Sequence, residues 1–131
     1  MYVLDTNTLI YFFKGQGKVV ENLLSTSPKE IAIPSIVLYE LEFGIAKSTS
    51  PEKRTTQLAE LCGLVTILEF GKAESKESAQ VRFELEKKGT PIGPYDILIA
   101  GTTLACNGVM VTNNVNEFSR ITNLRTINWY C

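Results

Sequence analysis

Short runs rich in β-branched and large apolar residues alternate along this 131-residue chain with longer helical stretches. The expected strands cover residues 2–4, 30–33, 64–68, 109–111 and 125–128, the last of them at an edge. The expected helices cover residues 8–14, 18–24, 35–47, 52–62, 72–88 and 95–106. Strands that alternate with helices are typical of a parallel sheet, because each parallel strand needs a crossover connection. The pattern predicts a single α/β domain over residues 1–131, with helices flanking a central parallel sheet.

The chain contains no histidine, which limits the chemistry open to it. Ser-His-Asp and Cys-His catalysis are excluded, and so are histidine metal ligands. The three cysteines fit no metal-binding spacing. A net charge of −1 is also not the basic excess that a dedicated nucleic-acid-binding domain usually carries. Any catalysis must therefore use carboxylates, hydroxyls, lysines or a metal ion.

The compartment follows from two further features of the sequence. No apolar run approaches the ~20 residues that a membrane-spanning helix needs. The first residues are typical of a strand, with no positive segment and apolar stretch before a cleavage site. We therefore expect a cytoplasmic protein with no membrane association.

Polar residues follow two of the expected strands where each strand ends. Asp5 comes directly after residues 2–4, and Thr112 comes directly after residues 109–111. Ligands of open α/β sheets bind beyond the carboxyl ends of the strands. Both side chains are therefore expected at this one edge of the sheet, which is called the rim from here on. The alternative for Asp5 is a helix N-cap, with Asn7 as local support.

Glu40 lies inside the expected helix 35–47, for which Ser35 is the expected N-cap. At about 100° per residue, Glu40 falls on the apolar face of that helix, whereas Glu42 falls on the other side and is expected in solvent. The neighbours of Glu40 on that face are Ile36, Val37, Phe43 and Gly44. Gly44 would let another backbone or a ligand approach closely. A carboxylate on a core-facing stripe needs a metal ion or, alternatively, a buried ion pair with Arg or Lys.

Asp96 lies in the first turn of the expected helix 95–106, which is apolar almost all round. It stacks over Ile99 and Ala100 and is expected to face inward, with the helix entry fixed by the two prolines of residues 91–94. The alternative is an ordinary favourable interaction with the N-terminal end of the helix dipole.

A fourth acidic group, Glu117, follows the turn that contains Thr112 and Asn114. Glu117 either points back to the rim or lies in solvent. Asn114 and Thr112 offer an amide oxygen and a hydroxyl at the same place.

Three clustered carboxylates, Asp5, Glu40 and Asp96, repel one another strongly unless a cation lies among them. At ~5 Å and an effective dielectric of ~20, each pair repels by roughly 3 kcal/mol. Three such pairs are comparable to the whole stability of a small domain. Oxygen ligands without His or Cys indicate Mg²⁺, with Mn²⁺ as a substitute. Such an ion can activate a water and neutralise a phosphate, which supports hydrolysis of a phosphodiester.

The motifs that contain these residues resemble those of the PIN-domain family, specifically its branch of VapC toxins. The motifs are Leu4-Asp5-Thr6-Asn7, Tyr39-Glu40-Leu41 with Gly44, Pro91-Ile92-Gly93-Pro94-Tyr95-Asp96, and Val111-Thr112-Asn113-Asn114 followed by Glu117-Phe118. Each motif is weakly specific by itself. Their order and separations cover essentially the whole chain and together carry the resemblance.

The resemblance implies a five-stranded parallel sheet and Mg²⁺-dependent endoribonuclease activity. It also implies a homodimer that is inhibited by a VapB-type antitoxin. By similarity, Asp5 and Asp96 would hold the metal, Glu40 would complete the site or orient the attacking water, and Glu117 would be a peripheral fourth acid. Much of the family has an aspartate where this chain has Asn114, so the fourth position stays open between Asn114 and Glu117.

The run from Pro91 to Asp96 resembles the subgroup that cuts initiator tRNA in its anticodon stem-loop, which makes tRNA the expected RNA substrate. Basic residues that would contact phosphates, unless they only form solvated faces, are Lys14, Lys72, Lys76, Arg82, Lys87 and Lys88. Aromatic residues that would line an antitoxin groove, unless they belong to the core, are Tyr11, Phe12, Phe13 and Tyr39.

Two other functions compete with the nuclease. A haloacid-dehalogenase-type phosphatase needs a second aspartate two residues after the first, where this chain has Asn7. A PIN-like binding module without catalysis would need no acidic set, and here Asp5, Glu40 and Asp96 are all present.

Overall fold

The computed structural model describes all residues from 1 to 131. The strands are β1 (Tyr2–Leu4), β2 (Ile31–Pro34), β3 (Thr66–Leu68), β4 (Val109–Val111) and β5 (Arg125–Ile127). The helices are α1 (Thr6–Lys14), α2 (Val19–Leu24), α3 (Ser35–Ala46), α4 (Pro51–Cys62), α5 (Lys72–Lys88), α6 (Pro94–Ala105) and α7 (Val115–Phe118). A 3₁₀ turn at Pro28–Glu30 precedes β2. None of the helices is both long and apolar enough to pass through a lipid bilayer.

The five strands form one sheet in the order β3-β2-β1-β4-β5, and all neighbouring pairs are parallel. This confirms the predicted α/β class with a central parallel sheet. The chain adds β2 and β3 on one side of β1, then crosses to add β4 and β5 on the other. The strand order therefore reverses between β1 and β4, which is where sheets of this type bind ligands.

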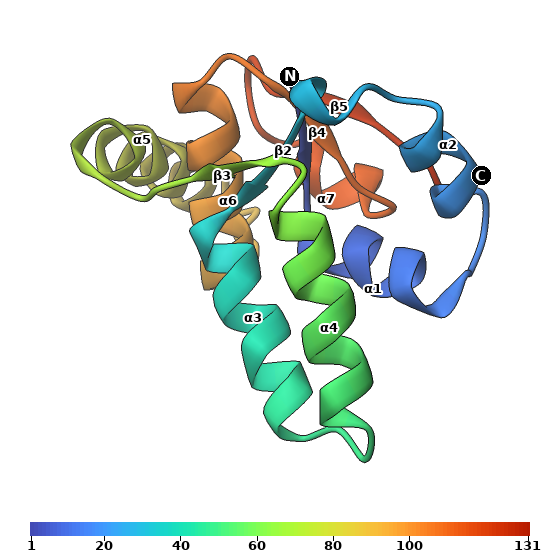
Figure 1. Cartoon of the computed structure of the whole chain (residues 1–131). Helices are drawn as coiled ribbons and strands as arrows, with labels where there is room; N and C mark the ends of the chain where they lie inside the picture. The colour runs from blue at the N-terminus through green and yellow to red at the C-terminus, as the bar shows by residue number, and fades with distance from the viewer.

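Helices cover both faces of the sheet, as Figure 1 shows. Helices α5 and α6 lie side by side on one flank, and α1 and α2 lie on the other. Because both faces are covered, consecutive residues Val3 and Leu4 of β1 are both fully buried. The hairpin of α3 and α4 projects away from the sheet, starting at the carboxyl end of β2.

The contact between α5 and α6 depends on a glycine. A Cβ atom on Gly101 would lie 2.7 Å from the backbone N and Cα of Ser78, so only glycine allows this approach of the two helices. Ser78 is itself buried, and α6 is buried at the five consecutive positions from Ile99 to Thr103. The expected burial of this helix is confirmed over this central stretch.

Several boundaries differ from the prediction for local reasons. Helix α1 begins at Thr6 because Asp5 caps it. Helix α3 has Pro34 rather than Ser35 at its N-cap, and no side chain caps it. The four-residue helix α7 was not predicted, because one turn carries too little periodicity to detect.

Candidate active site

The carboxyl ends of β1 and β4 are joined by hydrogen bonds at the point where the strand order reverses. The Asp5 backbone N–H donates to the Val111 carbonyl oxygen at 3.2 Å. The Thr8 hydroxyl donates to the same oxygen at 3.1 Å. These bonds hold the start of α1 against the end of β4, so that Asp5 and Thr112 share one rim as predicted.

Asp5 is buried, with 5% of its surface exposed. Its Oδ1 accepts the Thr8 backbone N–H at 2.9 Å, so the N-cap expected as an alternative is present. Burial raises the pKa of Asp5, whereas hydrogen bonds from Thr112 and Thr8 act to lower it. The Thr112 hydroxyl oxygen also accepts the backbone N–H of Asn114 at 2.9 Å, which fixes its orientation.

Glu40 reaches the same rim from α3. Its Oε1 accepts the hydroxyl of Thr6 at 2.6 Å, which ties α3 to the first residue of α1. Glu40 is half-buried and Glu42 is exposed, as the predicted helix phase requires. The alternative of a buried ion pair for Glu40 is wrong, because Arg82–Glu86 is the one ion pair of the chain.

The predicted apolar face of α3 is partly wrong. Phe43 is 57% exposed, and Gly44 is exposed with open space where a Cβ would lie. The buried stripe is formed instead by Val37 and Leu41. Glu40 lies between these two along the chain, at the edge of the stripe rather than at its centre.

Asp96 is the third residue of α6 and is half-buried. Burial is the main cause that raises its pKa to about 6, and the charges of Asp5, Glu117 and Glu40 contribute to the same shift. The missing side chain of Gly93 leaves room for the carboxylate, since a Cβ there would lie 3.4 Å from Asp96 Oδ2. The carboxylates of Asp5, Glu40 and Glu117, which come from three other segments, thus lie close enough to Asp96 to affect its pKa.

The remaining predicted residues differ in their placement. Glu117 lies in α7 and is half-buried, and its charge raises the pKa of Asp96. It therefore belongs to the same acidic cluster as Asp5, Glu40 and Asp96. Asn114 is half-buried at the start of α7, and its side chain does not cap that helix. Asn7 is exposed on the first turn of α1.

The donor set suits a hard cation that is held by few protein ligands. No three acidic or cysteine side chains are arranged so that together they could hold a metal ion. Mg²⁺ is commonly bound by one or two carboxylates, with waters and substrate phosphates completing its shell. Asp5 and Asp96 fit that pattern, because no basic side chain forms an ion pair with either of them.

Sequence reasoning missed two features of this rim. The first is Thr6, whose hydroxyl fixes Glu40 across 34 positions of the chain. The second is an exposed pair formed by Tyr39 and Tyr95, whose hydroxyl oxygens lie 3.4 Å apart. The signal for both was adjacency, since each of the three residues stands directly beside a predicted carboxylate.

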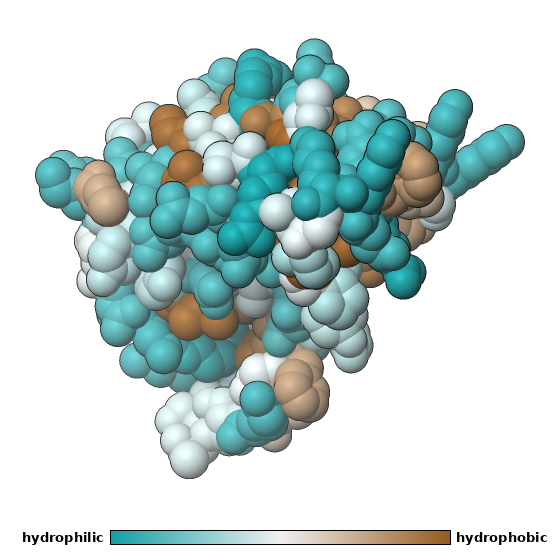
Figure 2. Space-filling view, turned by 180° about the vertical axis from the view of Figure 1, so that it is seen from behind, coloured by the Kyte–Doolittle hydropathy of each residue, from teal (hydrophilic) through white to brown (hydrophobic).

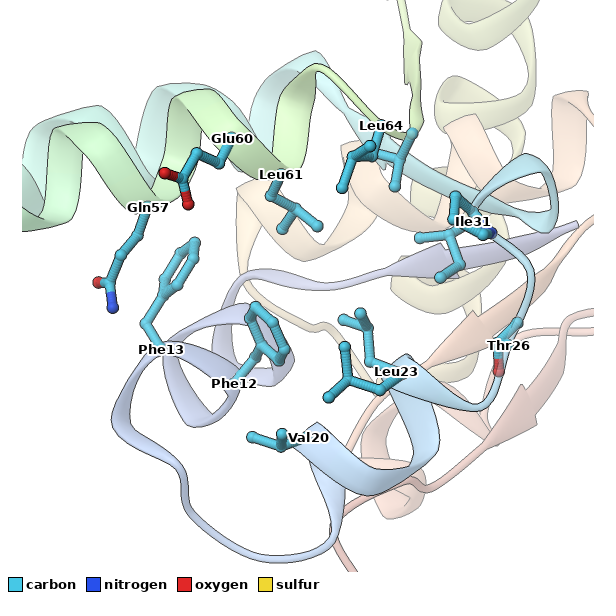
Figure 3. Close-up of a pocket in the computed structure, with 13 residues that line it drawn as sticks. Phe12, Phe13, Val20, Leu23, Thr26, Ile31, Gln57, Glu60, Leu61 and Leu64 are labelled. Carbon is cyan, nitrogen blue, oxygen red and sulfur yellow. The ribbon is translucent and has the colours of Figure 1, made fainter.

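Two grooves are lined in part by α1, and the second of them reaches the rim at Glu40. In one, of about 400 Å³, Phe12 and Phe13 of α1 and Leu23 of α2 lie on one side, and Leu61 and Leu64 lie on the other (Figure 3). The other groove, of about 330 Å³, lies between α1 and the α3–α4 hairpin. It is lined by Ile10, Phe13, Lys14, Glu40, Leu41, Gly44, Ile45, Ser48 and Arg54.

The aromatic residues expected in such a groove divide into two groups. Tyr11, Phe12 and Phe13 are half-buried and pack against the core, and Phe12 and Phe13 also line the grooves. Tyr11 instead stacks edge-on against Tyr130, with ring centroids 4.7 Å apart. Tyr39 is exposed outside both grooves.

This fold and this rim coincide with a known family. The model of the family described as PIN domain matches residues 2–124. The chain belongs to the PIN-domain family. The resemblance that the sequence motifs indicated is therefore confirmed.

The related proteins are VapC ribonucleases. The chain is 39% identical over 131 residues to Ribonuclease VapC2 of Rickettsia felis, covering 98% of each chain. It is 35% identical over 128 residues to the tRNA(fMet)-specific endonuclease VapC of Salmonella typhimurium, covering 98% of this chain and 97% of that protein.

Solved structures agree with this assignment. The crystal structure of VapBC2 from Rickettsia felis, bound to a DNA fragment from its promoter, matches with a TM-score of 0.90 at 38% identity. That match covers 98% of both chains. DNA-bound VapBC from Salmonella typhimurium matches with a TM-score of 0.91 at 35% identity, over 98% of this chain and 97% of that one.

Proposed function

We propose that this PIN domain, acting as one unit over residues 1–131, is a metal-dependent endoribonuclease and the toxin of a cytoplasmic toxin–antitoxin module. The observation that carries the proposal is the rim itself. The charges of Asp5, Glu40 and Glu117 raise the pKa of Asp96 there, and none of the four carboxylates forms an ion pair with a basic side chain. Such a cluster is stabilised by a divalent cation, for which Mg²⁺ is our proposal and Mn²⁺ the substitute.

Asp5 and Asp96 are the proposed metal ligands. Thr8 and Thr112 hold the Asp5 carboxylate in place, and the α5–α6 contact at Gly101 holds the helix that carries Asp96. When bound, the ion supplies charge for the scissile phosphate and lowers the pKa of an attacking water.

Glu40 is the proposed residue that orients this water and accepts its proton. Its Oε1 is fixed by the Thr6 hydroxyl, which leaves the second carboxylate oxygen, Oε2, available for the water. Glu117 adds a peripheral negative charge, and the amide of Asn114 is an additional oxygen donor beside it.

RNA is the proposed substrate, and tRNA the proposed class. Supporting this, the Salmonella relative is named as a tRNA(fMet)-specific endonuclease, and the proline-glycine run before Asp96 is the same motif that suggested the initiator tRNA anticodon stem-loop. Exposed basic residues that would contact the RNA backbone are Lys14, Lys72, Lys76, Lys87 and Lys88. Arg82 is engaged with Glu86 at 2.8 Å and is a weaker candidate.

A VapB-type antitoxin is the proposed partner, and the protein is proposed to act as a homodimer. Both structural relatives described above are VapBC complexes. The groove of Figure 3 is apolar and suits the nonpolar face of a helix or an extended peptide. Figure 2 shows a recess with hydrophobic residues where the tip of the α3–α4 hairpin separates from the body. Through the groove beside Glu40, a basic side chain of the antitoxin would reach the acidic rim.

The test is cleavage of a tRNA transcript by the purified chain in Mg²⁺, in EDTA, and with Asp96→Asn. We expect cutting in Mg²⁺ alone, and loss of cutting with EDTA or with Asp96→Asn. Glu42→Gln is the matched control, because this exposed carboxylate on α3 lies outside the rim. A binding module without catalysis would leave RNA intact under every condition. A phosphatase would release inorganic phosphate from small esters and leave RNA intact as well.

A further inference from the structure

Two solvent-exposed tyrosines contact each other beside the acidic rim. Tyr39 of α3 is 56% exposed, and Tyr95 of α6 is 42% exposed. Their ring centroids are 5.6 Å apart with an interplanar angle of 61°, and their hydroxyl oxygens are 3.4 Å apart. The pair is therefore a joint surface formed by two helices that are distant in sequence.

This pair does not serve the core. Neither tyrosine belongs to the buried cluster or to the half-buried side chains that pack against it. Large exposed aromatic side chains that contribute nothing to packing are typical of binding surfaces. The pair is therefore a candidate ligand-binding surface.

The position of the pair links it to the reaction. Tyr39 and Tyr95 directly precede Glu40 and Asp96, so each lies one residue away from a carboxylate of the rim. A neutral aromatic surface thus borders a strongly acidic site.

We propose that Tyr39 and Tyr95 form a stacking platform that holds an unpaired RNA base next to the scissile phosphate. This rests on the proposed ribonuclease function and adds a preference for single-stranded loops over duplex. In a duplex the bases stack on one another and are hidden, whereas unpaired bases can stack on aromatic side chains. The chain has a net charge of −1, so a neutral stacking contact would supply affinity that electrostatic attraction does not.

The magnitude follows from base stacking on aromatic rings. Removing one such contact lowers affinity by ~5- to 150-fold. The ring and not the hydroxyl carries the contact, so phenylalanine should replace either tyrosine and leucine should not. This difference separates stacking from a role of the hydroxyl groups in hydrogen bonding.

The experiment uses an RNA hairpin with 2-aminopurine in its loop and a duplex of the same sequence, titrated with the full chain in EDTA. We expect fluorescence quenching on binding of the hairpin. Tyr39→Leu and Tyr95→Leu should weaken hairpin binding by ~5-fold or more, while Tyr39→Phe and Tyr95→Phe should bind as the wild type does. Phe83→Leu, which removes an exposed aromatic from α5, is the matched control.

Binding in EDTA separates this inference from the proposed function. If the hairpin bound by stacking but was not cleaved in Mg²⁺, the proposed ribonuclease function would be refuted, whereas the proposed stacking platform would be supported. Equal binding of the leucine variants and the wild type would overturn the platform, as would equal affinity for hairpin and duplex. A change of oligomeric state in the leucine variants, measured by sedimentation velocity with RNA binding unchanged, would show that a second protein copy covers the pair and would also overturn it.

Discussion

Replacing Asp96 by asparagine removes one charge from the acidic cluster and should stabilise the metal-free protein at neutral pH. The folded structure raises the pKa of Asp96 from 3.8 to about 6, first by burial and then by the charges of Asp5, Glu117 and Glu40. A raised pKa means that folding disfavours the ionised form. The contribution of this carboxyl group to stability is therefore complete below about pH 4 and is lost as the pH rises through about 6.

The size of the effect follows from the pKa difference. A shift of roughly 2 units would correspond to about 3 kcal/mol without screening. Because the carboxylate is only half-buried, solvent screening reduces this to about 1–2 kcal/mol. In a chain of 131 residues, a stabilisation of this size raises the Tm by about 4–8 °C.

The assay is urea unfolding of the wild type and of Asp96→Asn in EDTA, across a pH series. Asparagine has nearly the same shape and does not titrate. Its advantage should therefore be near zero at about pH 4 and reach about 1–2 kcal/mol at about pH 7.5. Glu42 is an exposed carboxylate outside the rim, so the free energy of unfolding of Glu42→Gln should stay within about 0.5 kcal/mol of the wild-type value at every pH. An advantage for Asp96→Asn that did not depend on pH, or a loss of stability at neutral pH, would refute the reasoning.

Three further predictions test separate parts of the site and fold. Mg²⁺ should raise the Tm of the wild type by binding the native state, and Asp5→Asn should remove that increase in a calorimetric scan. Glu40→Ala should lower the rate of RNA cleavage by ~10²-fold or more while Glu42→Ala leaves it unchanged, because only Glu40 lies at the rim; the reverse result would mean that α3 is rotated. Gly101→Ala should destabilise the protein by about 1–3 kcal/mol in urea unfolding, because the new Cβ would lie 2.7 Å from the backbone of Ser78; unchanged stability would contradict the close helix contact.

The sequence predicted the parts of the site that follow from regular geometry. Asp5 and Thr112 meet because the carboxyl ends of adjacent parallel strands meet, and each end is visible in the sequence. Asp96 was predicted to face inward because its helix is apolar almost all round. These inferences need only the period of a helix and the direction of a strand.

The remainder depends on tertiary contacts that the periodicity of the sequence does not reveal. The predicted apolar face of α3 is right for Val37 but wrong for Phe43, which is exposed while Leu41 is buried, because apolar residues occur all around this helix. The hydrogen bond from Thr6 to Glu40 joins positions 34 residues apart. No periodicity could have revealed either feature.

The assignment of a metal to the rim is tested most directly by Mn²⁺ binding, measured from the electron paramagnetic resonance signal of the free ion. The account predicts that the wild type removes Mn²⁺ from solution, that Mg²⁺ releases it, and that Asp5→Asn and Asp96→Asn each abolish the uptake. Glu42→Gln should bind as the wild type does. If the wild type bound no Mn²⁺, or if the two aspartate variants bound it as well as the wild type, the carboxylate rim would not be a metal site.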